Sequence, residues 1–304
     1  MRIRALLLTI VTSFLFPAAL CADEGYFCGW YFKLQSERET LALIPSFHKT
    51  HDGNFSSLQV ITDDKVWNIR LPYEKLTRND GINPDITLDG CTFSEKGIHL
   101  DVHQEGIDLV GDISFGKWLP LRSNIMGPFR LVPFMQCRHG VWSAWHPVDG
   151  SISINGREYI FDGGSGYVEG DRGYSFPSTY IWTQCILDSG SVMLSVADIP
   201  MGLFHFTGII GFIIVDGVEY RIATYNGAKV VEIGDNSCTV RQGDMLLTVR
   251  LIRKNAYPLY APVNGAMDRV IRESASCLAG YTFSVAGRTL LDIESNKASF
   301  EYEW

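Results

Sequence analysis

Short runs in which apolar and polar residues alternate recur along most of the chain, separated by Gly, Asp or Asn. A period of two predicts β-strands with one buried face, whereas an amphipathic helix repeats its apolar residues every three or four positions. The predicted strands are 29–35, 40–47, 56–62, 65–71, 97–103, 106–115, 150–156, 157–163, 178–187, 192–199, 208–217, 218–227 and 244–252. One longer helix is predicted at 264–278, although its apolar period is imperfect. The pattern therefore predicts an all-β protein.

Glycine-containing turns join several of these strands. Asn-Gly and Asp-Gly pairs accept the positive φ angles of two-residue hairpins, and they occur at 155–156, 216–217 and 226–227. Three hairpins are therefore expected at these positions. Strands at such regular spacing favour a sandwich or a barrel.

The segment 118–145 interrupts the alternation, because Pro120, Pro128 and Pro133 stand among aromatic residues there. It is predicted to be a connector between two β halves of similar length and pattern. We expect an N-terminal domain at 23–135 and a C-terminal domain at 136–304.

The N-terminus has the layout of a secretory signal peptide over residues 1–22. Arg2 and Arg4 precede an apolar run at 5–20, and small residues follow it. We expect the chain to be exported; if this leader is misread, the cytoplasm or a plastid is the alternative. After cleavage six cysteines remain, and their wide spacing predicts that most are free and buried.

The overall charge narrows the classes of function that the protein can have. The formal net charge is −8 and Lys and Arg form no cluster, which argues against nucleic-acid binding. His99, Asp101 and His103 would share one face of a strand, but apolar residues alternate with them, so we expect a solvated strand face and no metal site. His48 and His51 are expected in a loop.

Chemistry is concentrated in the stretch GGSGYVEGDRGYSFPSTYIWTQC, residues 163–185. It is no dinucleotide loop, since the glycine after Gly166 comes one position late, and Ser165 lacks the glycine that a nucleophile elbow requires. The remaining hypothesis is a strand end at 167–169 and a tight turn at 170–173. Alternation then puts Tyr167 and Glu169 on one face, aimed at aromatic side chains: Trp142, Trp145, Tyr174, Phe176, Tyr180 and Trp182.

Several segments resemble the tocopherol cyclase family: 126–143, 154–185, 191–200 and 220–230, with 26–34 and 261–274 resembling that family's ends. The resemblance implies two lipocalin-like β-barrel or sandwich domains in tandem, related in plan to carotenoid hydratases. Tocopherol cyclases protonate the alkene of a prenylated hydroquinone, and the phenol oxygen captures the cation to close a chromanol ring. In the hydratases water captures the cation. Neither reaction implies a cofactor.

The resemblance also suggests roles for individual residues. Glu169 falls at the family's acid, with Asp171 as the second candidate and Tyr167 as the residue that orients the acid or binds the phenol. Burial would have to raise the carboxyl pKa from ~4.3. The predicted substrate contacts are His139, Trp142, Trp145, Tyr174 and Trp182. The sequence departs from the family at Cys28 and Arg172, and an arginine at 172 could lower the pKa of the acid.

The predicted function is a tocopherol cyclase-like isomerase that closes a ring on a prenylated phenol. The alternatives are an isoprenoid hydratase and a lipocalin-like carrier without chemistry. The expected partner is a small apolar prenylated substrate, reached by peripheral membrane association if necessary. No protein partner and no nucleic acid are expected.

Overall fold

The computed structural model describes residues 25–79, 83–133, 135–201, 204–253, 257–273 and 275–304, and the predicted signal peptide at 1–22 lies outside them. The first of its two large sheets holds β1 (Tyr26–Gln35), β2 (Thr40–Thr50), β3 (Gly53–Thr62), β4 (Val66–Leu71), β5 (Leu76–Arg78), β6 (Asp85–Leu88), β7 (Cys91–Ser94), β8 (Gly97–Gln104), β9 (Ile107–Phe115), β10 (Cys137–Ile154), β11 (Arg157–Ile160) and β12 (Gly164–Gly173).

The second large sheet holds β13 (Tyr180–Leu187), β14 (Gly190–Met201), β15 (Phe204–Val215), β16 (Val218–Ala223), β17 (Lys229–Gly234), β18 (Ser237–Gln242), β19 (Met245–Arg253), β22 (Cys277–Val285) and β23 (Arg288–Glu303). A separate hairpin consists of β20 (Tyr257–Val263) and β21 (Ala266–Glu273). The described helices are short 3-10 segments, η1 (Tyr73–Lys75), η2 (Gly127–Leu131) and η3 (Thr224–Asn226), none of which has the length and apolarity of a transmembrane span.

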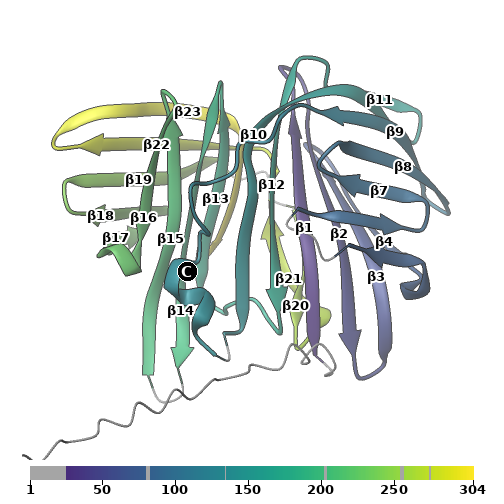
Figure 1. Cartoon of the computed structure of the whole chain (residues 1–304), viewed down its shortest axis with the longest axis horizontal. Coiled ribbons are helices and arrows are strands. Elements are labelled where there is room, and N and C mark those ends of the chain that lie inside the picture. Colours follow the sequence, from purple (N-terminus) through teal and green to yellow (C-terminus); the bar gives the residue numbers. More distant parts are fainter. Residues whose placement is uncertain (1–24, 80–82, 134, 202–203, 254–256, 274) are drawn as a thin grey trace, which may run out of the picture.

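The order of the strands shows how the chain is divided between the sheets. β1 pairs with β12 near the middle of the first sheet, and β13 pairs with β23 in the second, always antiparallel. Figure 1 shows the two curled sheets side by side, with β10, β12 and β13 between their outer parts. The fold is all-β, a tandem barrel or sandwich, as predicted. The hydrogen-bonded sheets change over between Gly173 and Tyr180, so β10 to β12 belong to the first sheet, whereas the domain division was expected after residue 135.

Alternation along the strands produces two separate barrel cores and a third apolar cluster between them. On β1, Trp30, Phe32 and Leu34 enter the first core, while Tyr31 points to the other face of the sheet. The second core is built in the same way from β13 and its neighbours, with Ile181 and Cys185 inside it. The third cluster joins residues of both sheets and therefore forms the interface on which the functional site depends.

Several local predictions are wrong, three of them in the connections between strands. The described residues of the segment 264–278, which are all but 274, form no helix, because Asn264 and Gly265 take positive φ angles and turn the chain from β20 into β21. The Asn-Gly pair at 226–227 closes η3 and joins strands at opposite edges of the second sheet, whereas the pairs at 155–156 and 216–217 form hairpins as predicted. The connector ends at residue 136, because β10 begins at Cys137.

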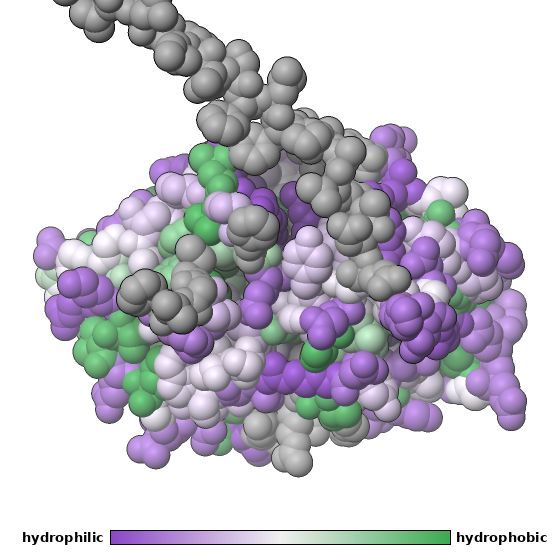
Figure 2. Space-filling model, turned by 90° about the horizontal axis from the view of Figure 1, so that it is seen from below, coloured by the Kyte–Doolittle hydropathy of each residue, from purple (hydrophilic) through white to green (hydrophobic). Residues whose placement is uncertain are grey.

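The surface seen in Figure 2 is mostly hydrophilic, and its apolar residues form small separate patches. Exposed large apolar side chains are correspondingly scattered over the molecule, with Leu131 in η2 and Val270 in β21 among them. Scattered exposed apolar residues are ordinary for a globular protein and indicate no particular interface.

Candidate active site

A cavity of about 180 Å³ lies at the interface between the two sheets. Its walls come from β1, β2, β10 and β12 on one side, from β13, β14, β15 and β23 on the other, and from the β20–β21 hairpin. Apolar side chains provide much of the lining. Phe176 packs edge-on against Phe27, with ring centroids 5.4 Å apart, and against Tyr180 at 6.3 Å. The cavity can therefore hold an apolar ligand between two structurally different walls.

Strand β12 brings three of the predicted residues onto one face. It continues through Gly173, so the tight turn expected at 170–173 is absent, and Tyr167, Glu169 and Asp171 alternate along an unbroken strand. The neighbouring strand β10 places His139 directly opposite Asp171. The sequence prediction of a shared face for Tyr167 and Glu169 is confirmed, because the Tyr167 hydroxyl donates a hydrogen bond to Glu169 Oε2 over 2.6 Å.

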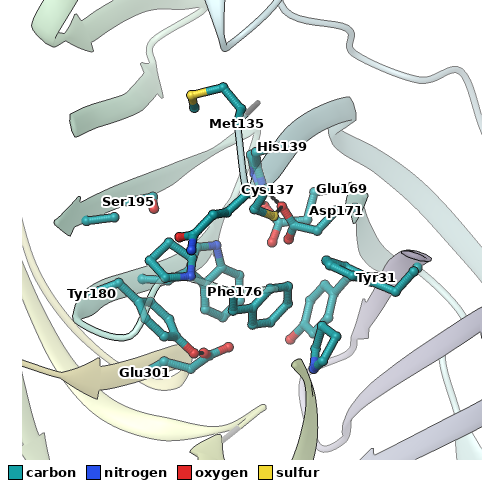
Figure 3. Close-up of a pocket in the computed structure, with 18 of the residues that line it drawn as sticks. Tyr31, Met135, Cys137, His139, Glu169, Asp171, Phe176, Tyr180, Ser195 and Glu301 are labelled. Atoms are coloured by element: carbon teal, nitrogen blue, oxygen red, sulfur yellow. Dashed lines mark hydrogen bonds and ion pairs between the residues drawn. The ribbon is translucent and has the colours of Figure 1, made fainter. Parts of the chain in front are cut away.

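His139 lies between the two acids of β12. Its Nδ1 is 3.0 Å from Asp171 Oδ1 and hydrogen-bonded to it, and its Nε2 forms an ion pair with Glu169 Oε2 over 3.1 Å. The Cys137 thiol also donates to Asp171, with 3.2 Å between sulfur and oxygen. Figure 3 shows His139, Cys137, Glu169 and Asp171 converging in one group, which we call the β12 cluster together with Tyr167.

The charges of this cluster hold a proton on the histidine. Burial by itself would lower the pKa of His139, but the charges of Asp171 and Glu169, together with the hydrogen bond to Asp171, outweigh it and raise that pKa well above its usual value. Burial, together with the Glu169 charge, raises the pKa of Tyr167 well above the ordinary range, so its phenol remains a donor. The result is an imidazolium between two carboxyl groups on a cavity wall.

The glycines of the motif serve close packing of β12. A Cβ on Gly170 would lie 2.4 Å from the Gly29 carbonyl oxygen, and one on Gly166 would lie 2.3 Å from His146 Nε2. Real Cβ atoms do not approach so closely, and the Gly29 contact involves backbone that cannot easily move. The glycines that resemble a phosphate loop in the sequence thus let neighbouring strands and an imidazole ring lie against β12.

The opposite wall carries an acid that the sequence analysis missed. Glu301, on β23, is 7% exposed and lines the cavity, where it accepts a hydrogen bond from the Tyr180 hydroxyl. Burial is the main reason that its pKa rises to about 8, with further contributions from Asp171 and Glu169. The only signal in the sequence is the alternating ending FEYEW, which places Glu301 on the face opposite the core residue Phe300.

The predicted aromatic contacts are only partly brought together. Trp182 lines the cavity beside Tyr31, with ring centroids 5.5 Å apart. Trp142 instead packs against the first barrel core, and Trp145 donates its indole N–H to Ser165. Tyr174 is 45% exposed. These three lie outside the lining because the irregular pairing of β10 with β12 and the end of β12 at Gly173 turn them away.

The other histidines discussed in the sequence analysis lie outside the β12 cluster. His48 lies in β2 and not in a loop; it is buried, lines the cavity and contacts Ser46 Oγ through Nε2 over 3.0 Å. Burial lowers its pKa to about 4, so it is neutral. His99, Asp101 and His103 share an exposed face of β8 as expected, and no group of residues in the described ranges could hold a metal ion.

Two residues differ from the pattern of tocopherol cyclases, Arg172 and Cys28, and both lie away from the cavity. The Arg172 side chain is exposed and alternates with Asp171, so it faces away from the cavity. Cys28 is buried in the first barrel core. None of the six cysteines in the described part of the chain forms a disulfide, in line with the prediction, and all but Cys137 are buried.

Comparisons with known proteins support the fold. The sequence matches no protein-family model, and no curated protein matches it. Among solved structures it is similar to CghA, with 9% identity, a TM-score of 0.59, and 91% of this chain and 88% of that chain covered.

Two other solved structures are similar over comparable lengths. Kievitone hydratase from Nectria haematococca has 7% identity and a TM-score of 0.52, with 91% of this chain and 88% of that chain covered. A protein assigned as AttH from Nitrosomonas europaea has 11% identity and a TM-score of 0.50, with 92% of each chain covered. These likenesses show a lipocalin-like tandem fold. The resemblance to tocopherol cyclases stays a prediction.

Proposed function

We propose that this protein is an enzyme of the hydratase or cyclase kind that adds an O–H bond across an alkene, and specifically that it closes a ring on a prenylated phenol or hydroquinone. The observation that carries the proposal is the β12 cluster, a protonated histidine between two carboxyl groups on the wall of an apolar cavity. Such a group can exchange protons with a bound substrate without a cofactor.

The rest of the cavity suits a carbocation intermediate. Protonation of a trisubstituted alkene gives a tertiary cation, and an aromatic face stabilises a desolvated cation by about 2 kcal/mol. Phe176 and Trp182 supply such faces within the lining. An apolar site also restricts water, which competes with the phenol oxygen for the cation.

The fold is compatible with the proposal without establishing it. One structure of similar fold is named a hydratase, which is the same class of addition with water as nucleophile. Fold alone does not define function, so the argument depends on the cluster. Export of the enzyme, and peripheral contact with membranes that hold its substrate, remain parts of the proposal that follow from the sequence.

The test uses purified protein, a phytylated hydroquinone and heavy water, followed by mass spectrometry. A cyclase gives a ring-closed product of the substrate's formula with one carbon-bound deuterium, and a hydratase gives a product heavier by one water. Glu169→Gln should reduce the rate by about 10²- to 10⁴-fold, the usual range for a proton-transfer group. Glu294→Gln is the matched control, because Glu294 is exposed on β23. Bound but unchanged substrate would reject the enzyme and favour a carrier.

A further inference from the structure

We propose that Glu301 is the proton donor to the alkene, while the β12 cluster on the other wall removes the proton of the attacking oxygen. This inference rests on the proposed function and divides its two proton transfers between two sites. It adds a catalytic residue in the last strand of the chain, more than a hundred positions from the motif that the sequence analysis singled out.

The position of Glu301 is the first argument. Its strand β23 pairs with β13, which sets Glu301 directly opposite Trp182 in the register, and both side chains line the cavity. Figure 3 shows the Glu301–Tyr180 pair on the side of the cavity away from Glu169 and Asp171, with Phe176 drawn between the two groups. A substrate in the cavity therefore lies between two acidic sites on different sheets.

The surroundings of Glu301 favour a neutral acid. Among the described residues no Lys, Arg or His forms an ion pair with it, and it accepts a hydrogen bond from the neutral Tyr180 hydroxyl. Burial raises the pKa of Glu301 to about 8, so the carboxyl keeps its proton at neutral pH. The β12 cluster, in contrast, holds two carboxyl groups for one imidazolium and can take up a proton. Two titratable sites with opposed environments are the usual arrangement of an acid and a base.

A free donor lies beside Glu301. The Trp182 indole N–H is buried and has no hydrogen-bond partner among the described residues, although it lines the cavity. An unpaired buried donor is unfavourable, so a small shift of the ring that brings this N–H to a ligand oxygen in the cavity would be favourable. We therefore expect the substrate to present on this wall an oxygen other than the attacking phenol oxygen, such as the second hydroxyl of a hydroquinone.

The step balances without an oxidant or another reactant. The O–H bond of Glu301 breaks, and its proton forms a new C–H bond with the alkene π electrons, leaving a tertiary cation. The phenol oxygen then forms the C–O bond, and its proton passes to the β12 cluster. The product has the formula of the substrate. Glu301 regains a proton, and the cluster loses one, by exchange with water between turnovers.

The experiment compares wild type, Glu301→Gln and the control Glu294→Gln, all as full-length protein, in two assays. The first is turnover of the phytylated hydroquinone. We expect Glu301→Gln to lower the rate by at least about 100-fold, with the affinity for a substrate analogue that has a saturated chain changed less than about twofold. The wild-type rate should fall as pH rises through about 8, and Glu301→Asp should restore part of the activity. Turnover of Glu301→Gln near the wild-type rate would overturn the inference and leave the proposed function standing.

The second assay needs no turnover. A prenylated hydroquinone with a tertiary ammonium in place of the cationic carbon is bound about one pH unit above the pKa of Glu301, where the carboxylate attracts the ammonium. Glu301→Gln should weaken this binding about tenfold and leave the saturated neutral analogue unaffected. If wild type turns over no hydroquinone, the proposed cyclase fails; the assignment of Glu301 then survives only if this ammonium preference depends on Glu301. Equal ammonium binding by both proteins overturns it. Circular dichroism of each variant checks that it is folded.

Discussion

Each wall of the cavity buries a glutamate, and the two walls accommodate the buried carboxyl group in different ways. On the first sheet, Glu169 is buried and Asp171 half-buried beside His139, whose pKa they raise, so charges of opposite sign compensate one another. On the second sheet, Glu301 is buried with a neutral tyrosine as its partner, and its own pKa rises. The two glutamates thus lie in different electrostatic surroundings, because one wall supplies a cation and the other does not.

A substitution of His139 should have the largest effect, because this residue supplies the cation that distinguishes the first wall from the second. A His139→Leu variant removes the cation from between buried Glu169 and half-buried Asp171, and loss of one partner of a buried ion pair costs about 3–5 kcal/mol. We expect a decrease of that size in the free energy of unfolding at neutral pH, measured by urea denaturation. His51→Ala, at an exposed turn position, is the control and should change stability little. A loss below about 1 kcal/mol would contradict a compensated charge network.

The uncompensated wall can be examined through the pH dependence of stability. Folded Glu301 keeps its proton up to about pH 8, whereas the unfolded chain releases it near 4.5. Between these values the folded state binds more protons, so stability decreases as pH rises, by up to ~1.4 kcal/mol per pH unit. Glu301→Gln should flatten this dependence and be more stable than wild type at pH 8, as measured by urea unfolding across that range. Parallel curves for the two proteins would show that Glu301 is not a buried neutral acid.

The smallest effect is expected on the outer face of β12. Arg172 alternates with Asp171 and is exposed, so Arg172→Ala should change the free energy of unfolding by less than about 0.5 kcal/mol and turnover by less than about twofold. A large loss of turnover would mean that this arginine acts on the cluster through the strand. That result would undermine the separation between the inner and outer faces of the wall.

The sequence predicts the fold better than the site. Strand alternation and two of three Asn-Gly or Asp-Gly turns are enough to indicate an all-β tandem protein, because burial of one strand face is a local pattern. The face shared by Tyr167 and Glu169 follows from the same alternation, and the structure confirms it.

The opposing acid could not be found in this way. Glu301 meets Trp182 only through the pairing of β13 with β23, which joins positions more than a hundred residues apart. Nor could spacing show that Trp142 and Trp145 turn away, because this depends on the irregular pairing of β10 with β12. The wall formed by β12 could be predicted, because its residues are neighbours in the sequence. The wall that carries Glu301 could not, because it depends on the pairing of strands distant in the sequence.

The location of the candidate chemistry has a consequence for how such proteins diversify. His139, Glu169, Asp171 and Glu301 lie outside both barrel cores, which hold the interior of each sheet together. Replacements among these wall residues leave the interior packing of each barrel in place, so a lineage can exchange one reaction for another while inheriting the same scaffold. A fold shared with proteins of only 7–11% identity fits that history. Laboratory evolution aimed at new activities would accordingly start with the cavity residues at the interface between the two sheets and leave the barrel interiors unchanged.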